Sequence, residues 1–142
     1  MENTPVIHKG RPLLVQNHRS TERWGHACTF DPQSRQWPTN IAAFYQAAAE
    51  AGVVIKFNHP GPGTNVFNGL AYSEVGDRTV KLIEVRRDQE EKAYVRALQQ
   101  GWHVAPDGSD DTPVAYWGNA KSWSQIWAPG LLRRNIWEAL KA

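Results

Sequence analysis

The side chains in this sequence that could carry out chemistry are imidazoles and carboxylates at the ends of expected strands. His59 follows the apolar run Val53 to Phe57, and Asp110 lies in the acidic turn after the expected strand Trp102 to Ala105. The carboxyl ends of parallel strands meet at one edge of a sheet, where α/β folds hold ligands and catalytic groups. Imidazole with carboxylate suits zinc, manganese or iron, because these cations bind such ligands and can activate water.

Two more histidines come from strands that could reach the same edge. His18 lies in the polar group after the expected strand Pro12 to Gln16, and His26 lies at the start of the expected strand Gly25 to Phe30. If the strand of His26 runs antiparallel to its neighbours, its first residue lies beside the carboxyl ends of the other strands. In that arrangement His26 would reach the same edge of the sheet as His18 and His59.

Each of these residues also has an ordinary structural interpretation. A single histidine in a turn is usually a hydrogen-bonded surface residue, and aspartates in a run such as 107–111 usually stabilise the turn through backbone amides. His8 and His103 receive only this interpretation, because one lies near the amino terminus and the other inside an expected strand. The shared location of His59 and Asp110 is what favours a ligand site for them.

The stretch Ile41 to Gly63 predicts the helix, strand and turn that position His59. Apolar residues recur at helical spacing. Thr39 or Asn40 can cap the helix start, and Gly52 suits the left-handed position after a helix. The β-branched run that follows is typical of a buried parallel strand. Two prolines then end the strand, because proline cannot donate a hydrogen bond to a neighbour.

Later segments extend this pattern. We expect a loop over residues 61–69, a strand from Thr79 to Val85 with imperfect alternation, a helix capped by Asp88 that runs to about Gln100, and a last helix from Leu131 to Leu140. Residues 113–117 could form a short strand or a lead-in. The order of elements is typical of an α/β fold with a mostly parallel sheet flanked by helices.

Length and composition limit the classes of protein and partner. The 142 residues, 41% of them hydrophobic, can bury one core but are too few for a complete eight-stranded barrel of about 250 residues. We expect one domain over residues 11–142, with residues 1–10 as a flexible arm or an edge segment. Sixteen basic and 14 acidic residues are interleaved at a net charge of +2, so no nucleic-acid partner is indicated.

The single cysteine, Cys28, excludes an internal disulfide and fits a reducing compartment. No apolar run approaches the roughly 18 residues of a membrane span, and the amino terminus lacks an apolar signal core. We therefore expect a cytoplasmic protein without a membrane partner.

Aromatic and arginine side chains offer weaker alternatives. Trp117, Trp123 and Trp127 could form a platform for a sugar or a base, although such residues more often fill the core of a small domain. Four arginines could grip phosphate, but arginines on helix surfaces are usually solvated, and we leave them out of the site. They are Arg86, Arg87, Arg133 and Arg134.

Five short motifs lie along residues 12–142 in a fixed order. They are Arg23-Trp24-Gly25-His26-Ala27, Ala51-Gly52 through Asn58-His59-Pro60-Gly61, Ile83-Glu84-Val85, Gly101 before Gly108-Ser109-Asp110, and Glu138-Ala139-Leu140. In this order the chain resembles the carboxyl-terminal two thirds of a domain from the polymerase and histidinol phosphatase (PHP) superfamily of metal-dependent phosphoesterases, in its CehA/McbA-like branch. The family fold is a distorted α/β barrel whose strand ends hold two or three metal ions.

The resemblance implies metal-ligand roles for His26, His59 and Asp110, with zinc, manganese or iron as the cation. No His-x-His motif occurs in the sequence, although the family domain opens with one, and Thr112 stands where a further family histidine is expected. The resemblance therefore implies a truncated PHP-like barrel in which one metal ion keeps an open position for water.

Two functions follow as expectations. In the first, the chain is a metal-dependent hydrolase of the PHP phosphoesterase type. A metal-activated water attacks a phosphate ester or related bond of a small-molecule substrate, and His18 or Asp111 assists proton transfer. In the second, the chain is a catalytically inactive PHP-derived remnant that binds a ligand, or that forms a homodimer through an open sheet edge.

Overall fold

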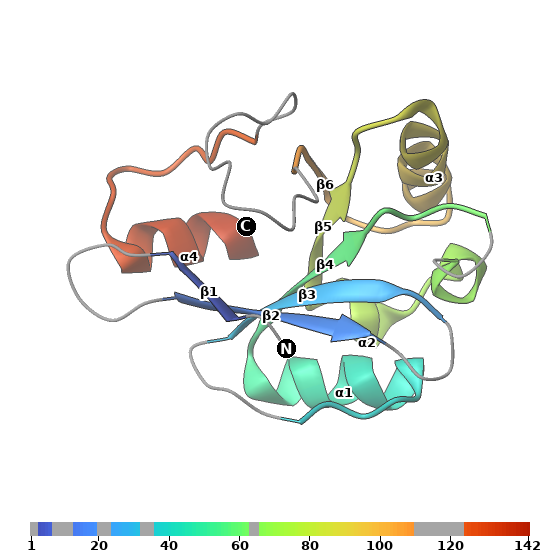
Figure 1. Cartoon of the computed structure of the whole chain (residues 1–142), viewed down its shortest axis with the longest axis horizontal. Coiled ribbons are helices and arrows are strands. Elements are labelled where there is room, and N and C mark those ends of the chain that lie inside the picture. Colours follow the sequence, from blue (N-terminus) through green and yellow to red (C-terminus); the bar gives the residue numbers. More distant parts are fainter. Residues whose placement is uncertain (1–2, 7–12, 20–23, 32–35, 63–65, 110–123) are drawn as a thin grey trace.

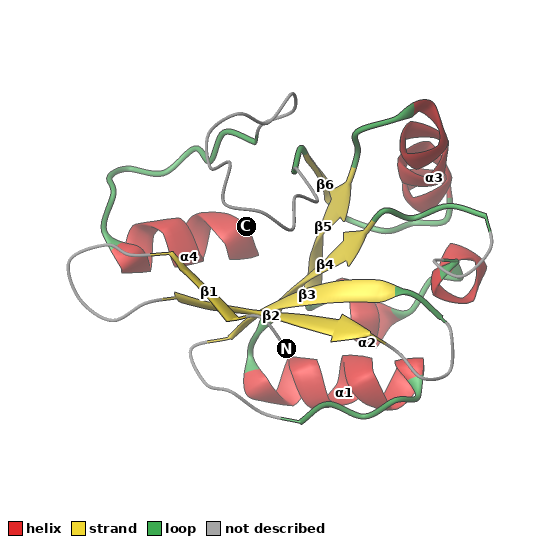
Figure 2. Cartoon of the chain, viewed as in Figure 1, coloured by secondary structure: helices red, strands yellow, loops and turns green. Residues whose placement is uncertain are grey.

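A computed structural model describes residues 3–6, 13–19, 24–31, 36–62, 66–109 and 124–142 of the chain (Figure 1). The strands are β1 (Asn3–Val6), β2 (Leu13–Arg19), β3 (His26–Asp31), β4 (Val54–Asn58), β5 (Val80–Glu84) and β6 (Ala105–Asp107). The helices are α1 (Ile41–Ala51), the 3₁₀ helix η1 (Phe67–Leu70), α2 (Glu74–Asp77), α3 (Asp88–Gln99) and α4 (Arg133–Lys141). Figure 2 shows α1 and α4 on opposite sides of the strands.

The strands form one sheet in the linear order β1-β2-β3-β4-β5-β6. The pairs β1/β2, β2/β3 and β3/β4 are antiparallel, whereas β4/β5 and β5/β6 are parallel. The α/β class is therefore confirmed. Strands β4, β5 and β6 run parallel to one another, and β3 runs antiparallel beside β4. Residues 3–6, expected to belong to an arm or an edge segment, form an edge strand.

The reversal of direction at β3 brings several strand ends to one edge of the sheet. Arg19 at the end of β2 pairs with His26 at the start of β3, and His26 pairs with Asn58 at the end of β4. On the parallel side, Glu84 at the end of β5 pairs with Asp107 at the end of β6. This edge, which we call the polar edge, therefore carries the carboxyl ends of β2, β4, β5 and β6 and the amino end of β3.

Local signals determine the helix before β4. The side chain of Asn40 accepts a hydrogen bond from the backbone N–H of Ala43 at 3.1 Å, as an N-cap residue does. Gly52 adopts a left-handed conformation (φ +64°) and its N–H donates to the carbonyl of Ala49. Both ends of the predicted helix are confirmed.

An aromatic cluster packs β4 against α1 and η1. Phe44 and Tyr45 of α1, Phe57 of β4 and Phe67 of η1 are buried in one apolar cluster that also contains Trp102. The rings of Phe57 and Phe67 stack at a centroid distance of 4.0 Å. Burial of such rings dominates the energetics of a small core, so this cluster fixes the strand that presents His59.

Three predicted elements need correction. Helix α3 starts at Asp88, but its N-cap is Arg87, because the buried Glu90 carboxylate accepts the backbone N–H groups of Arg86 and Arg87 at 2.7 and 3.1 Å. The strand expected at residues 102–105 pairs only from Ala105. The loop expected over residues 61–69 contains the start of η1. The short helix α2 follows, where the sequence analysis predicts no element. The strand considered for residues 113–117 lies outside the described residues.

Candidate functional site

His26 and His59 meet at the polar edge. The Nδ1 atom of His26 lies 3.2 Å from Nε2 of His59, and the two rings are nearly perpendicular, with an interplanar angle of 84°. One histidine comes from the start of β3 and the other from the residue after β4. Both side chains are partly exposed, so the pair can be reached from solvent.

Glu84, at the end of β5, holds His59 by both its backbone and its ring. Its Oε2 atom accepts the backbone N–H of His59 at 2.8 Å and lies 3.2 Å from the ring Nδ1. This contact favours the tautomer that carries the proton on Nδ1. The lone pair of Nε2 is then directed toward His26.

The Glu84 carboxylate is ionised in this setting. Burial raises its pKa, but the contact with the His59 ring, the hydrogen bond from the His59 backbone and the charges of Lys56 and Arg86 outweigh burial and lower the pKa to about 2. The Nε atom of Arg86 lies 2.5 Å from Oε1 of Glu84. The Nη2 atom of Arg86 also lies 3.8 Å from Oε1 of the fully buried Glu90, which extends the network. The His59 ring therefore rests on a carboxylate that stays charged at neutral pH.

The turn at His59 has an unusual backbone. Its φ angle is +34°, in a region that residues other than glycine rarely occupy. Such conformations persist where the surrounding structure holds them, and they are frequent at functional sites. Here the hydrogen bond from the His59 N–H to Glu84 supplies that restraint.

A second polar group lies on the same strands. The ammonium of Lys56 in β4 contacts Oδ2 of Asp107 at 2.9 Å and Oγ of Ser109 at 3.1 Å. The side-chain amide of Asn58 donates to Sγ of Cys28 at 3.0 Å. Burial raises the pKa of the Cys28 thiol. The ion pair of Lys56 with Asp107 links β4 to β6 across the sheet.

The structure brings only two of the predicted site residues together and describes the others in part or not at all. His26 and His59 are brought together, as described. His18 lies within β2 and pairs with Ala27, one position away from the pair formed by Arg19 and His26; its side chain is outside the described part of the structure. Asp110 and Asp111 also lie outside the described residues. Their roles as metal ligand and catalytic residue stay predictions.

The histidine pair fits part of a metal site. Two nitrogens bound to one tetrahedral zinc ion at about 2.0–2.1 Å lie roughly 3.3–3.4 Å apart, and the observed separation is 3.2 Å. A carboxylate on the far nitrogen of a ligating histidine is a common supporting contact in zinc sites, and Glu84 occupies that place. Across the described residues, no group of three or more histidine, cysteine, aspartate or glutamate side chains could hold a metal ion.

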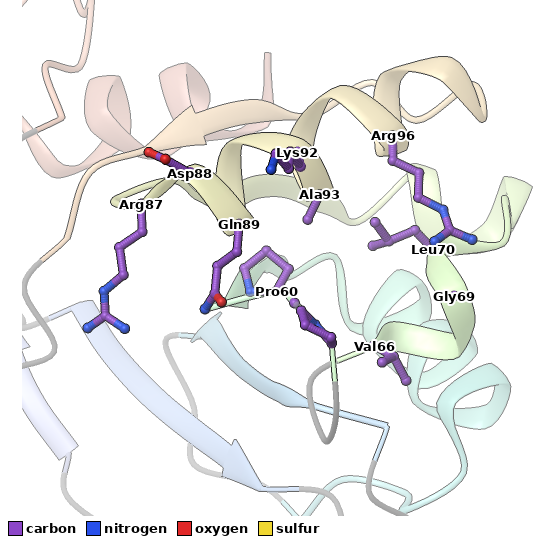
Figure 3. A pocket seen from close by; sticks show the side chains of 12 residues that line it. Pro60, Val66, Gly69, Leu70, Arg87, Asp88, Gln89, Lys92, Ala93 and Arg96 are labelled. Atoms are coloured by element: carbon purple, nitrogen blue, oxygen red, sulfur yellow. The ribbon is translucent and has the colours of Figure 1, made fainter.

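A cavity of about 780 Å³ begins at the residue after His59 (Figure 3). One wall is the face of α3 that bears Lys92 and Arg96. The other is formed by residues 60–62 with Val66, Gly69 and Leu70. The cavity therefore joins the turn of the histidine pair to a positively charged helix face.

The sequence interpretation missed Glu84 and the cavity residues of α3. Glu84 closes an expected strand one unit after the strand of His59, and this position was a usable signal. Lys92 and Arg96 are four residues apart, so they share a helix face. No sequence pattern indicates that this face lines a cavity.

Comparison with protein-family models, with curated proteins and with solved structures found no match to this chain. Within the described residues, no helix has the length and apolar character needed to cross a membrane.

Proposed function

We propose that the chain is a metal-dependent hydrolase of the PHP type that acts on a phosphate ester or a related small substrate. The observation that carries this proposal is the 3.2 Å separation of the ring nitrogens of His26 and His59, with Glu84 on the far nitrogen of His59. The resemblance to PHP domains supports it, and so does the placement of both histidines at strand ends. The open α/β sheet would be a segment of the distorted family barrel.

Each residue has a defined part in this proposal. His26 and His59 hold the cation, and Asp110 completes the set. The Glu84 carboxylate favours a proton on Nδ1 of His59, so the Nε2 lone pair stays available for the cation. A bound zinc or manganese ion would supply a water of lowered pKa, near 7 for zinc. His18 or Asp111 takes up or delivers the proton during attack on the ester.

Metal analysis of the purified protein tests this function. We expect stoichiometric zinc, manganese or iron by mass spectrometry, a rise in melting temperature when the metal is added to chelator-treated protein, and hydrolysis of p-nitrophenyl phosphate. His26→Ala and His59→Ala should lose the metal and the activity while circular dichroism shows a retained fold.

His103→Ala is a matched control for these variants. His103 is also a histidine beside a carboxylate, at 2.7 Å from Asp77, but its side chain is 79% exposed and lies in neither site. Its replacement should leave metal content unchanged. A wild-type protein without metal, whose melting temperature does not respond to zinc or manganese, would contradict the proposal.

The second candidate is a PHP-derived protein that binds a ligand without catalysis. It is favoured by the absence of a three-ligand group among the described residues and by a cation-lined cavity that needs no metal. In this case β1 or β6, the two edges of the described sheet, could pair with a second copy. Light scattering that shows a dimer in a metal-free protein would favour this function, and a monomer at high concentration would count against the dimer.

A further inference from the structure

The cavity beside the His59 turn has walls of different character. Helix α3 contributes Arg87, Lys92 and Arg96 from one side, together with the carboxylate of Asp88. Figure 3 shows Arg87 and Arg96 at opposite ends of this wall, with Lys92 between them. Three cations therefore face a cavity whose lining contains one carboxylate.

These cations are not neutralised by neighbours. Within the described residues, no ion pair or side-chain hydrogen bond involves the charged groups of Arg87, Lys92 or Arg96. The contrast with Arg86, which contacts the carboxylates of Glu84 and Glu90, is direct. An anion in this cavity would meet charges that the protein leaves available.

The opposite wall is apolar. It consists mainly of Pro60, Pro62, Val66 and Leu70, and Ala93 extends the apolar surface onto the helix between the charged residues. A small inorganic anion would leave this wall in contact with water. A ligand with an apolar body would bury it, and the cavity volume of about 780 Å³ is within the range of about 300–1,000 Å³ that is usual for small-molecule sites.

We infer that this cavity binds a small organic anion that joins a phosphate-type or carboxylate head to an apolar body. The head pairs with Lys92 and Arg96, which are four residues apart on one face of α3, and the body lies on the proline-rich wall. This inference concerns binding alone and does not require a metal at the histidine pair. It can therefore hold or fail independently of the proposed hydrolase.

Calorimetric titration of chelator-treated protein with phenylphosphonate tests the inference. This probe has an oxyanion head and an apolar ring, and it contains no ester bond. We expect saturable binding that weakens as salt is added. Lys92→Gln and Arg96→Gln should each raise the dissociation constant by about tenfold or more, because each removes a charge-assisted hydrogen bond. Arg96→Lys should restore part of the loss.

Two comparisons separate specific binding from general charge effects. Arg134→Gln removes one positive charge from an exposed position of α4, away from the cavity, and should leave the dissociation constant unchanged. Val66→Ser should weaken binding of phenylphosphonate but not of inorganic phosphate, because only the former reaches the apolar wall. The inference is overturned if phenylphosphonate does not saturate, if Lys92→Gln and Arg96→Gln match Arg134→Gln, or if inorganic phosphate binds as tightly as phenylphosphonate.

Discussion

Replacement of Glu84 by glutamine tests the polar network that holds His59. The Glu84 side chain is 2% exposed, contacts Arg86 at 2.5 Å and accepts the His59 backbone N–H at 2.8 Å. Glutamine keeps the size of the side chain and one carbonyl oxygen for the backbone hydrogen bond, but it removes the negative charge. The variant therefore removes the charge together with the acceptor oxygen that faces Arg86.

The magnitude follows from the pKa of Glu84. Burial raises this pKa, while His59, Lys56 and Arg86 lower it, and the net result is a fall from 4.5 to about 2. At about 1.4 kcal/mol per pKa unit, the ionised carboxylate contributes on the order of 3 kcal/mol to the free energy of unfolding. Because the folded-state pKa lies below the unfolded value, this contribution is fully present above pH 4.5. It is lost as the pH falls through about 2.

Urea unfolding of chelator-treated protein, followed by the fluorescence of the seven tryptophans, measures the effect. At about pH 7 we expect Glu84→Gln to be less stable than wild type by about 3 kcal/mol. The difference should shrink steadily below about pH 4.5 and approach zero near pH 2.

The exposed Glu74, paired with Arg78 at 2.5 Å, provides the control. Glu74→Gln should change stability by less than about 0.5 kcal/mol at any pH. A difference between Glu84→Gln and wild type that is equally large at about pH 3 and pH 7 would refute the electrostatic reasoning. It would assign the destabilisation to packing instead.

Two further predictions concern the core and the thiol. Gly76→Ala should lower stability by about 1–3 kcal/mol, because the added Cβ would lie 2.9 Å from ring atoms of both Trp102 and Tyr45. Gly52→Ala, whose Cβ meets nothing within 4 Å, should cost only the strain of its left-handed backbone, about 1 kcal/mol; thermal unfolding that ranks the two variants in reverse would contradict this packing. Cys28 should react with iodoacetamide at least about tenfold more slowly in the native protein than in urea, because burial both shields the thiol and raises its pKa. Equal rates would show that β3 opens readily.

The sequence predicts α1 and β4 well because their signals are local. The Asn40 cap and the left-handed Gly52 act within a single helical turn, and the short β-branched run after Gly52 is typical of a buried strand. The same kind of evidence placed His59 at a strand end. Side chains whose position depends only on the end of a strand are therefore predictable from sequence.

The segment from Trp102 to Ala105 shows where local evidence fails. Its composition resembles a strand, but the Trp102 indole N–H donates to the carbonyl of Leu70 at 2.8 Å, and its ring packs against Tyr45 and Phe57. These partners lie 32 or more residues away in the chain. Tertiary packing thus places Trp102 and Val104 in the core, and pairing with β5 begins at Ala105.

The contact between Glu84 and His59 depends on an irregularity between β4 and β5. The pairing runs from Ile55 with Val80 directly to Lys56 with Leu82, so β5 has one extra residue at this point. An extra residue shifts the side chains beyond it to the opposite face of the sheet. Val80 and Ile83 are consequently both buried in the α1-side core, although they are an odd number of positions apart in the strand.

Without this bulge, regular alternation from Val80 would direct Glu84 into the apolar core, where an ionised carboxylate is strongly unfavourable. With it, Ile83 lies beside Phe57 in the core and Glu84 extends the pairing toward Asn58 and the His59 turn. The imperfect alternation of the strand from Thr79 to Val85 is the trace of the bulge in the sequence. The bulge places the apolar Ile83 in the core and the carboxylate of Glu84 beside His59. Its location therefore depends on core packing, which no local sequence pattern specifies.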